Sequence, residues 1–545
     1  MRKMWKKVMT IILALVMTLG LGTSVQAAAL SGGENTNSTN VTITGLPADK
    51  TVTFATYQVI KTKFDTAANE LTYQLTDWAK AVLATGGKTE DDVIKEISKL
   101  NTTGTSTTEQ DNIVNQLAAA SKTAYSATWT VSSDKTTATA NLPIGSYLVM
   151  ASCTDMTFLN MLVSVNAKAN TTDPNGWTLE GKGAVLKGNP LSVDKKITGK
   201  KGTAQAPIDE TTAAIGDTLS YTVTADVPHY PANATHTTFK VKDTPTNLEI
   251  KLDTVKVYGV NADGPAELTD QFTPTLDNGV LTVDMSSKYQ TLFCANGTYP
   301  YATVKITYDA VLMESASIAT GNTNKPALIY GTDPYTESDA SDEEIPGDGK
   351  QKVYTYGLKL TKKNSGGDVL SNAVFSVKSG DTTLKFIADT AAKGTYTLAK
   401  DQGATGATDQ LKTNDQGTFN IKGLDANVEY VIEETKAPSG YFRNHGSVAF
   451  TITPAVATNG KLTGAIQSVA AKDEKGTTLN NAGVWTCGVD HNTAYVAVTL
   501  KDTKIPFLPA TGGMGTVIFT IVGDALMILA IVLFIRSRKG RKEDR

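Results

Sequence analysis

Residues 430–441 read YVIEETKAPSGY, an alternation of apolar and polar residues that ends in a Pro-Ser-Gly turn. Side chains alternate between the two faces of a strand, so Tyr430, Ile432 and Glu434 share one face. An apolar strand face packs into a core, so Glu434, which lies on this face, is expected to be buried. Because burial favours the protonated form of a carboxyl group, the sequence predicts a buried, protonated Glu434 that can polarise a carbonyl and transfer protons.

A second strand-like run, LKLTKKN at residues 358–364, places a lysine in the same kind of position. Leu358, Leu360 and Lys362 fall on one face, and Lys359 falls on the other. Lys362 is therefore expected to point inward with the leucines. Burial disfavours the ammonium form of lysine and leaves a nucleophilic amine.

These segments resemble a known family of domains. Residues 430–441 follow the E-box pattern of Gram-positive pilins, YxΦxETxAPxGY with Φ apolar, and the runs around Lys362 and Asp502 resemble the first and last strands of a collagen-adhesin B-type domain. The resemblance implies an immunoglobulin-like β-sandwich in which Lys362 condenses with Asp502 beside Glu434, with close positioning in place of an activating group. Pilins usually have asparagine at the Asp502 position, so the implied reaction loses water rather than ammonia. A buried ion pair, or three unrelated surface charges, is the alternative.

The preceding block offers a similar set of residues. Lys195, in the run LSVDKKI, shares a strand face with apolar residues. The resemblance to the middle domain of pilins implies that Lys195 is the nucleophile, Asp243 the catalytic acid and Asn324 the acceptor. Asn324 stands ahead of an Ala-x-x-Tyr strand, which favours it over Asn322, but the choice between them stays open. Solvated side chains at strand ends are the alternative.

The C-terminal region contains three signals in series. They are Leu508-Pro509-Ala510-Thr511-Gly512, an apolar stretch at 515–535 and a basic tail at 536–545. The stretch is long enough for a transmembrane helix with its positive end in the cytoplasm, and the surrounding apolar residues offset the cost of about 3 kcal/mol for Asp524. A Pro-Gly turn before an ordinary membrane anchor is the alternative.

The three signals together resemble the sorting signal of cell-wall-anchored proteins. In that family a sortase cysteine attacks the carbonyl at the Thr511 position and releases Gly512 onward, and an amine then resolves the acyl-enzyme. The implied partners are a pilus-type or housekeeping sortase and peptidoglycan.

Residues 1–27 are expected to be a signal peptide. A basic head precedes an apolar run at residues 8–21, which is too short to span a bilayer, and small residues at 25–27 suit signal peptidase. An exported protein can form disulfides. However, its cysteines are odd in number and widely spaced, so a disulfide framework is not expected and their state stays open. These cysteines are Cys153, Cys294 and Cys487.

The chain between these ends is expected to be mainly β, with antiparallel sandwiches in tandem, and the resemblance to pilins implies that these are immunoglobulin-like domains of the collagen-adhesin A and B types. Threonine, valine and tyrosine abound, and alternating patterns recur. The expected domains are an N-terminal pilin domain at 31–188, a middle isopeptide domain at 189–336 and a B-type isopeptide domain at 350–504. The helices expected in the first domain are Asp77–Leu83, Asp91–Leu100 and Gln110–Ser121. The acidic segment 337–349 is expected to be a solvated linker, with calcium binding as the alternative.

Enzymatic turnover finds little support in this sequence. The net charge is −3 and the exported portion has no basic patch, so nucleic acid is not an expected partner. The four histidines lack metal-ligand spacing and no phosphate-binding loop follows a strand. No cofactor and no metal are expected, and each isopeptide bond would form once, within the chain.

The segment before the middle domain, WTLEGKGAVLKGNP at 177–190, contains a candidate linking lysine. In pilins such a lysine follows a tryptophan at the junction of the first two domains, which implies Lys187, with Lys182 as the next candidate. The segment lacks the Tyr-Pro pair of the fuller WxxxVxVYPK form. An ordinary solvated lysine is the alternative.

Two classes of function fit these signals. The first is a structural shaft subunit of a covalently polymerised pilus, with other copies of itself and accessory pilins as partners, and an accessory pilin is a variant of it. The second is a monomeric wall-anchored adhesin whose first domain binds a host surface ligand. Lys187 and the E-box favour the first.

Overall fold

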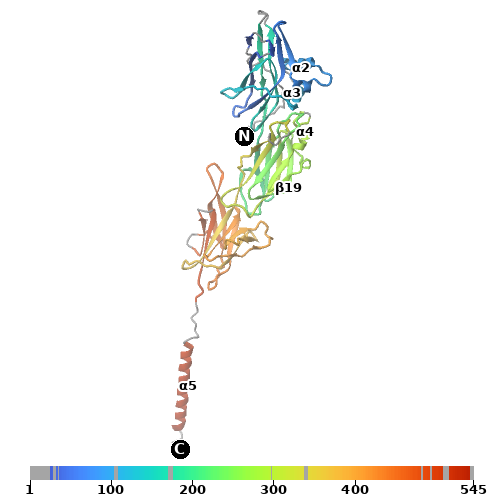
Figure 1. Ribbon diagram of the computed structural model, residues 1–545. Coiled ribbons are helices and arrows are strands. Elements are labelled where there is room, and N and C mark those ends of the chain that lie inside the picture. The colour runs from blue at the N-terminus through green and yellow to red at the C-terminus, as the bar shows by residue number, and fades with distance from the viewer. Residues whose placement is uncertain are drawn as a thin grey trace.

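The computed structural model describes residues 25–28, 32–34, 36–103, 108–169, 176–295, 297–336, 342–479, 483–490, 494–506 and 515–540. Three β-rich domains follow one another in an elongated molecule, and a long helix lies beyond the third (Figure 1). Residues 1–24, with most of the expected signal peptide, and residues 507–514, with the LPATG motif, lie outside the described residues. The prediction of a mainly β protein built from sandwich domains is confirmed.

The first domain has two sheets and a short helical layer. The larger sheet has the order β1-β11-β10-β8-β4-β2, with β5 on β4. Its strands are β1 (Val25–Ala28), β2 (Gly33–Glu34), β4 (Thr53–Asp65), β5 (Glu70–Leu75), β8 (Gly145–Ser152), β10 (Met161–Ala169) and β11 (Trp177–Lys182). The smaller sheet has the order β12-β3-β7-β6, with β3 (Ser38–Thr44), β6 (Thr130–Val131), β7 (Thr137–Pro143) and β12 (Ala184–Val185).

The helices of the first domain cover the outer face of its larger sheet. They are α1 (Asp77–Leu83), α2 (Glu90–Thr103) and α3 (Thr108–Ala119), within a few residues of the predicted helices. Along β8, Tyr147 and Val149 enter the core between the two sheets, whereas Leu148 packs in the core beneath the helices. Both faces of this strand are therefore buried, which is why its sequence is apolar without a break.

The second domain is a sandwich of two sheets whose neighbouring strands are antiparallel except for the parallel pair β16 and β26. One has the order β15-β14-β17-β23-β19-β20 and the other β16-β26-β24-β18-β22-β21, with β25 on β24. The strands of the first are β14 (Val193–Lys200), β15 (Thr203–Ile208), β17 (Thr218–Asp226), β19 (Leu248–Asn261), β20 (Gly264–Glu267) and β23 (Thr303–Leu312). Those of the second are β16 (Glu210–Thr212), β18 (Phe239–Pro245), β21 (Thr275–Asp277), β22 (Val280–Asp284), β24 (Asn322–Gly331), β25 (Asp342–Pro346) and β26 (Lys352–Tyr354). Short helical turns are η1 (Thr269–Gln271), η2 (Ser286–Lys288) and α4 (Tyr289–Leu292).

The acidic segment differs from the expected solvated linker. Residues 342–346 form β25, which pairs antiparallel with β24 at the edge of the second domain. Ile345 is only 8% exposed and joins the core, while the flanking Glu343 and Glu344 are exposed. A single apolar residue thus attaches an acidic strand to the sheet, and the charges keep this edge from pairing with other chains.

The third domain is also a sandwich of two sheets. The first has the order β32-β30-β31-β34-β27-β39-β38, and the second has the order β29-β28-β35-β36-β37 with β33 on β28. The strands of the first are β27 (Tyr356–Asn364), β30 (Phe386–Ala388), β31 (Thr395–Leu398), β32 (Ala407–Thr408), β34 (Thr418–Leu424), β38 (Trp485–Asp490) and β39 (Tyr495–Asp502). Those of the second are β28 (Val374–Ser379), β29 (Thr382–Thr383), β33 (Leu411–Lys412), β35 (Glu429–Lys436), β36 (Ser447–Val456) and β37 (Leu462–Asp473).

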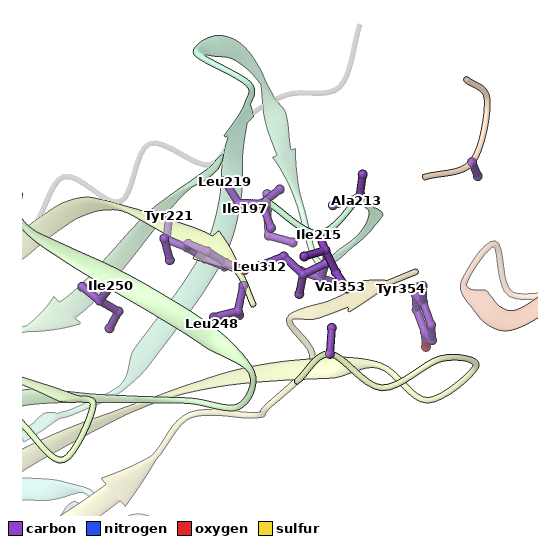
Figure 2. Packing of buried hydrophobic residues seen from close by; sticks show 14 of the residues in the cluster. Ile197, Ala213, Ile215, Leu219, Tyr221, Leu248, Ile250, Leu312, Val353 and Tyr354 are labelled. Atoms are coloured by element: carbon purple, nitrogen blue, oxygen red, sulfur yellow. The ribbon is translucent and has the colours of Figure 1, made fainter. Parts of the chain in front are cut away.

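The second and third domains share one continuous hydrophobic core. Figure 2 shows part of it at their junction, where Ile215 lies near Leu312 and Val353. The backbone N–H of Ile215 donates to the carbonyl of Gly423 in the third domain at 3.0 Å. Lys200 Nζ of the second domain lies 2.5 Å from Oδ2 of Asp425 in the third, whose side chain is almost fully buried. These two domains therefore form one mechanical unit.

The first and second domains meet through a smaller contact. A two-stranded sheet joins β9 (Met156–Phe158) to β13 (Gly188–Pro190), the segment that connects the domains. The first domain keeps its own hydrophobic cores. Its orientation therefore depends on this ribbon, on a few polar contacts and on Tyr335 of the second domain, which packs against one of these cores.

The last helix, α5 (Gly515–Gly540), is apolar and exposed along its described side chains. Its segment Val517–Arg538 contains an 18-residue window with a mean hydropathy of 2.7 and is long enough to cross a membrane. The helix ends among arginines and lysines.

Candidate cross-link sites

The third domain brings its first and last strands side by side. β27 and β39 are parallel neighbours, with Lys362 opposite Leu500 and Asn364 opposite Asp502. Lys362 and Asp502 both point into the sandwich, where β35 of the facing sheet presents Glu434. The alternation of apolar residues along β27 and β35 turns these charged side chains inward with their neighbours.

The three side chains meet in the core. Lys362 and Glu434 are each 0% exposed, and Asp502 is 2% exposed. Lys362 Nζ lies 3.1 Å from Glu434 Oε1 and is in direct contact with Asp502 Oδ1. Despite these contacts, none of these three atoms has a hydrogen bond of acceptable geometry to a described residue. A buried charge set of this kind is costly as separate ions, because the desolvation is not repaid by aligned hydrogen bonds.

Burial raises the pKa of Glu434, which favours its protonated form. Its other oxygen, Oε2, accepts a hydrogen bond from the backbone N–H of Asn444 at 2.9 Å, and Arg443 Nε donates to its backbone carbonyl. Burial also raises the pKa of Asp502. The segment that follows the E-box thus fixes Glu434 with one oxygen toward Lys362.

The second domain contains another buried lysine. Lys195 of β14 lies on one sheet, and Asp243 of β18 lies on the other, so their contact crosses the sandwich. Lys195 Nζ is 2.5 Å from Asp243 Oδ2 and donates to the hydroxyl of Tyr308 at 2.5 Å. The Tyr308 hydroxyl in turn contacts Asp243 Oδ2. All three side chains are buried.

The structure brings Asn324, rather than Asn322, to this cluster. Asn324 is fully buried, and its Nδ2 donates to the Tyr308 hydroxyl at 2.8 Å. Asn322 is held elsewhere: its Oδ1 accepts from Asn247 Nδ2 and from the backbone of Ser317, and its Nδ2 donates to the carbonyl of Val353. Its amide group is therefore already engaged in local structure.

The environment of Lys195 shifts this side chain toward the neutral amine. Burial lowers the pKa of Lys195 to about 8, against the opposing attraction of Asp243. The rings of Tyr221 and Tyr308 lie 4.6 and 5.1 Å from Nζ, measured to the ring centroids, and are stacked on each other. Sequence reasoning missed both tyrosines, although strand alternation in TLSYTVTAD and TVKITYDAVL puts them on the apolar faces of β17 and β23.

Lys187 lies at the junction of the first and second domains, between β12 and β13. Its carbonyl accepts from the backbone of Leu159 at 3.1 Å, and its side chain is half-buried. Within the described ranges, no ion pair or side-chain hydrogen bond is found for its Nζ. By contrast, Lys182 is engaged by Glu180 in a close ion pair.

Two family models match parts of this chain. A prealbumin-like fold domain matches residues 357–464, which include the E-box and all but the first residue of β27, and the LPXTG cell wall anchor motif matches residues 501–544. The second match covers the sorting motif, the last helix and most of the basic tail. The predicted cell wall anchor is therefore confirmed.

Similar proteins occur among bacterial surface proteins. The chain is 24% identical over 425 residues to the trypsin-resistant surface T6 protein of Streptococcus pyogenes serotype M6, covering 69% of this chain and 73% of that protein. The solved T6 backbone pilin of the same organism has the same fold, with a TM-score of 0.55, 18% identity and coverage of 88% of this chain and 100% of that one. The major pilin SpaD of Corynebacterium diphtheriae aligns at 18% identity with a TM-score of 0.44, covering 86% of this chain and 98% of that one.

Proposed function

We propose that this protein, a cell-wall-anchored surface protein of the sortase-assembled major pilin type, is the shaft subunit of a covalent pilus in which Thr511 of one copy is joined to Lys187 of the next. The observation that carries the proposal is the amine of Lys187, half-buried at a domain junction without a described partner, in a chain that ends in an LPXTG anchor. A shaft subunit needs both an acyl donor and an acyl acceptor, and a monomeric adhesin needs only the donor.

The joining reaction follows from the sorting signal. A sortase cysteine attacks the Thr511 carbonyl, the bond to Gly512 breaks, and a thioester forms as the new amino terminus leaves. The neutral Nζ of Lys187 then attacks the thioester, which forms an amide and releases the cysteine thiol. Because Lys182 is held by Glu180, Lys187 is the better nucleophile of the two.

A second part of the proposal concerns the third domain. The amine of Lys362 attacks Cγ of Asp502, the new N–C bond forms, and one carboxyl oxygen leaves as water. Glu434, whose pKa burial raises, supplies a proton to the leaving oxygen and recovers one from the amine. The product replaces an ion pair that lacks aligned hydrogen bonds with a neutral amide, so the buried cluster loses its two formal charges.

The same chemistry with ammonia as the leaving group is proposed for the second domain. Lys195 Nζ attacks Cγ of Asn324, and Nδ2 leaves as ammonia. Asp243 Oδ1 and Asn324 Oδ1 are both buried and lack hydrogen-bond partners among the described residues. A proton on Asp243 would turn one of these unpaired oxygens into a donor, which is the role expected of the catalytic acid.

Both bonds suit a fibre under tension. In the third domain, force that enters along β27 would pass from Lys362 directly to Asp502 and leave along the chain that follows β39. The residues between these two positions would carry none of it. The rate of forced unfolding depends on the height of the unfolding barrier. A covalent bridge prevents the residues between Lys362 and Asp502 from being extended, so their extension is no longer a step of unfolding.

The proposal is tested by polymerisation in the native organism. Wall material released by muramidase and resolved on a denaturing gel is expected to give a high-mass ladder. Lys187→Arg is expected to collapse the ladder to a monomer that remains anchored to the wall, while the matched control Lys182→Arg retains it. A monomer-sized band alone for the wild type would contradict the shaft subunit and leave the anchored adhesin.

A further inference from the structure

The base of the third domain, where β27 and β39 end, exposes apolar side chains. Residues 440–442 pair with residues 503–505: the N–H of Phe442 donates to the carbonyl of Thr503, and the N–H of Ile505 donates to that of Gly440. In this pairing Phe442 and Ile505 share one face, because they flank the bridge between Tyr441 and Lys504. Phe442 is 53% exposed and Ile505 is 42% exposed.

The same base is basic. Arg443, Lys501 and Lys504 are exposed, and among the described residues none of them forms an ion pair. We call this surface, Phe442, Arg443, Lys501, Lys504 and Ile505, the basal patch. Exposed apolar residues ringed by charge on one end of a domain are typical of an interaction site.

The junction around Lys187 has complementary features. β9 lies beside the segment that follows Lys187 and exposes part of Met156 and Phe158. Immediately before β9, residues 152–154 line a cavity of about 560 Å³ that also has Asp49 and Glu343 in its wall. Both carboxylates are exposed, and no ion pair of either is found in the part of the chain that the structure describes. The junction therefore offers apolar side chains beside unpaired negative charge.

The short segment between the basal patch and Thr511 limits how far apart these two surfaces can lie in two joined copies. Ile505, in the basal patch, stands six residues before Thr511. Six residues span at most about 20 Å when fully extended. Since the Thr511 carbonyl must reach the side-chain nitrogen of Lys187 in another copy, Ile505 lies within about this distance of that nitrogen.

We propose that the basal patch docks on the junction between the first and second domains of a second copy of this chain, around that copy's Met156 and Phe158, with Arg443, Lys501 and Lys504 facing Asp49 and Glu343. This inference rests on the proposed function. It adds a non-covalent contact that positions the Thr511 carbonyl beside Lys187 and then stiffens the joint between subunits.

The test replaces Phe442 with a photoreactive residue in the full-length chain, assembled by its own sortase in the native organism. Irradiated pili are expected to yield cross-links from position 442 to peptides containing residues 152–158 or Asp49. The two surfaces lie at opposite ends of the unit formed by the second and third domains (Figure 1), so such a cross-link joins two copies. Leu252, which is 40% exposed on the middle domain, is the control position and should give no cross-link to these peptides.

A paired substitution gives a second readout. Phe442→Glu with Ile505→Glu should lower the yield of polymer about fivefold or more, as expected when contacts at the centre of an interface are lost. The amount of wall-anchored monomer should be unchanged or higher, which shows that folding and sorting persist.

The outcomes separate this inference from the function on which it rests. If the wild type contains no bond between Thr511 and Lys187, the shaft-subunit proposal fails. If that bond is present but position 442 cross-links to other surfaces, to lipid or within its own domain, the docking inference is overturned and the shaft subunit stands. Wild-type polymer yield from the paired variant would likewise overturn the docking inference.

Discussion

Asp502 and Asn324 are proposed to play the same part in two domains with different leaving groups. A carboxylic acid loses water when it condenses with lysine, and an amide loses ammonia. The mature chain should therefore be lighter than its sequence by one water and one ammonia. This difference assigns each bond to its domain without a structure.

Substitution of Glu434 gives the sharpest test of the third domain. Glu434→Gln removes the group that transfers protons while keeping its size, so the Lys362–Asp502 bond should not form. Intact-mass measurement of the exported chain should show a gain of one water beyond the change of residue. Asp502→Asn is the matched control: it should still form the bond, now with loss of ammonia. An unchanged water deficit in Glu434→Gln would show that Glu434 is not the catalytic acid.

The amine of Lys195 gives a pH dependence with a defined sign. In Asn324→Ala the bond cannot form, and Lys195 remains a buried amine. Its pKa of about 8 in the folded protein lies below the ordinary lysine pKa of 10.5. Between these values the unfolded chain binds more protons than the folded one, so the stability of the middle domain should rise as pH increases through this window and should be constant below it.

Chemical denaturation of Asn324→Ala from pH 7 to pH 10 would measure this rise. The control carries Lys195→Met as well, which removes the titrating group and should flatten the profile in that window. Equal profiles for the two variants would contradict a depressed pKa at Lys195.

At the scale of elements, the link between the second and third domains depends on a few contacts at the ends of strands. Lys200, the last residue of β14, reaches Asp425 just beyond β34 and also donates to the carbonyl of Thr212. Lys200 is partly exposed, unlike Lys195 and Lys362, which are fully buried. Lys200 and Asp425 are therefore expected to remain an ion pair and to make no contribution to the mass deficit.

Removal of Lys200 should loosen this link. Lys200→Ala leaves Asp425 buried without its partner and should destabilise the unit by about 2 kcal/mol, less than for a fully buried pair because Lys200 is partly exposed. Asp425→Ala in the same background should recover part of the loss. Calorimetry of the exported chain should resolve the second and third domains as separate transitions in the single variant only. One shared transition with unchanged stability would argue against this role.

The alternation of side chains along strands accounts for most of what could be predicted about the elements. It selected Lys362 and Glu434 as inward-facing because each lies two residues beyond a core residue, Leu360 and Ile432. The helices of the first domain could also be predicted, because their apolar spacing is distinct from that of the strands. The contact of Asp502 with Lys362 depends on the pairing of β27 with β39, a long-range pairing that local pattern does not encode, and was inferred from the resemblance to pilins.

Other features of the fold and the sites could not be predicted from the local sequence pattern. β25 was expected to be solvated because its single apolar residue, Ile345, is surrounded by acids, and only its pairing with β24 accounts for the burial. Tyr308 was missed since a tyrosine on an apolar face looks like any core residue until its hydroxyl is seen against Lys195 and Asp243. Such roles depend on which strands face each other across the sandwich.

At the scale of the whole molecule, the proposed bond to Lys187 would set how subunits overlap. It lies between the first and second domains, whereas Thr511 follows the base of the third. A bond between them places the first domain of one copy alongside the third domain of the next. The axial repeat of the fibre should therefore be shorter than one three-domain subunit and close to the length of the second and third domains together. Electron microscopy of isolated pili would measure it, and a repeat equal to the full subunit would contradict this arrangement.

The bond between subunits is the central claim, and mass spectrometry of digested wall material from the native organism tests it most directly. We predict a branched peptide in which the carbonyl of Thr511 is joined to the side-chain nitrogen of Lys187. The same digest should contain Thr511 joined to the peptidoglycan cross-bridge from the subunit at the wall. Material in which Thr511 is joined to peptidoglycan alone, with every Lys187 unmodified, would contradict the shaft subunit.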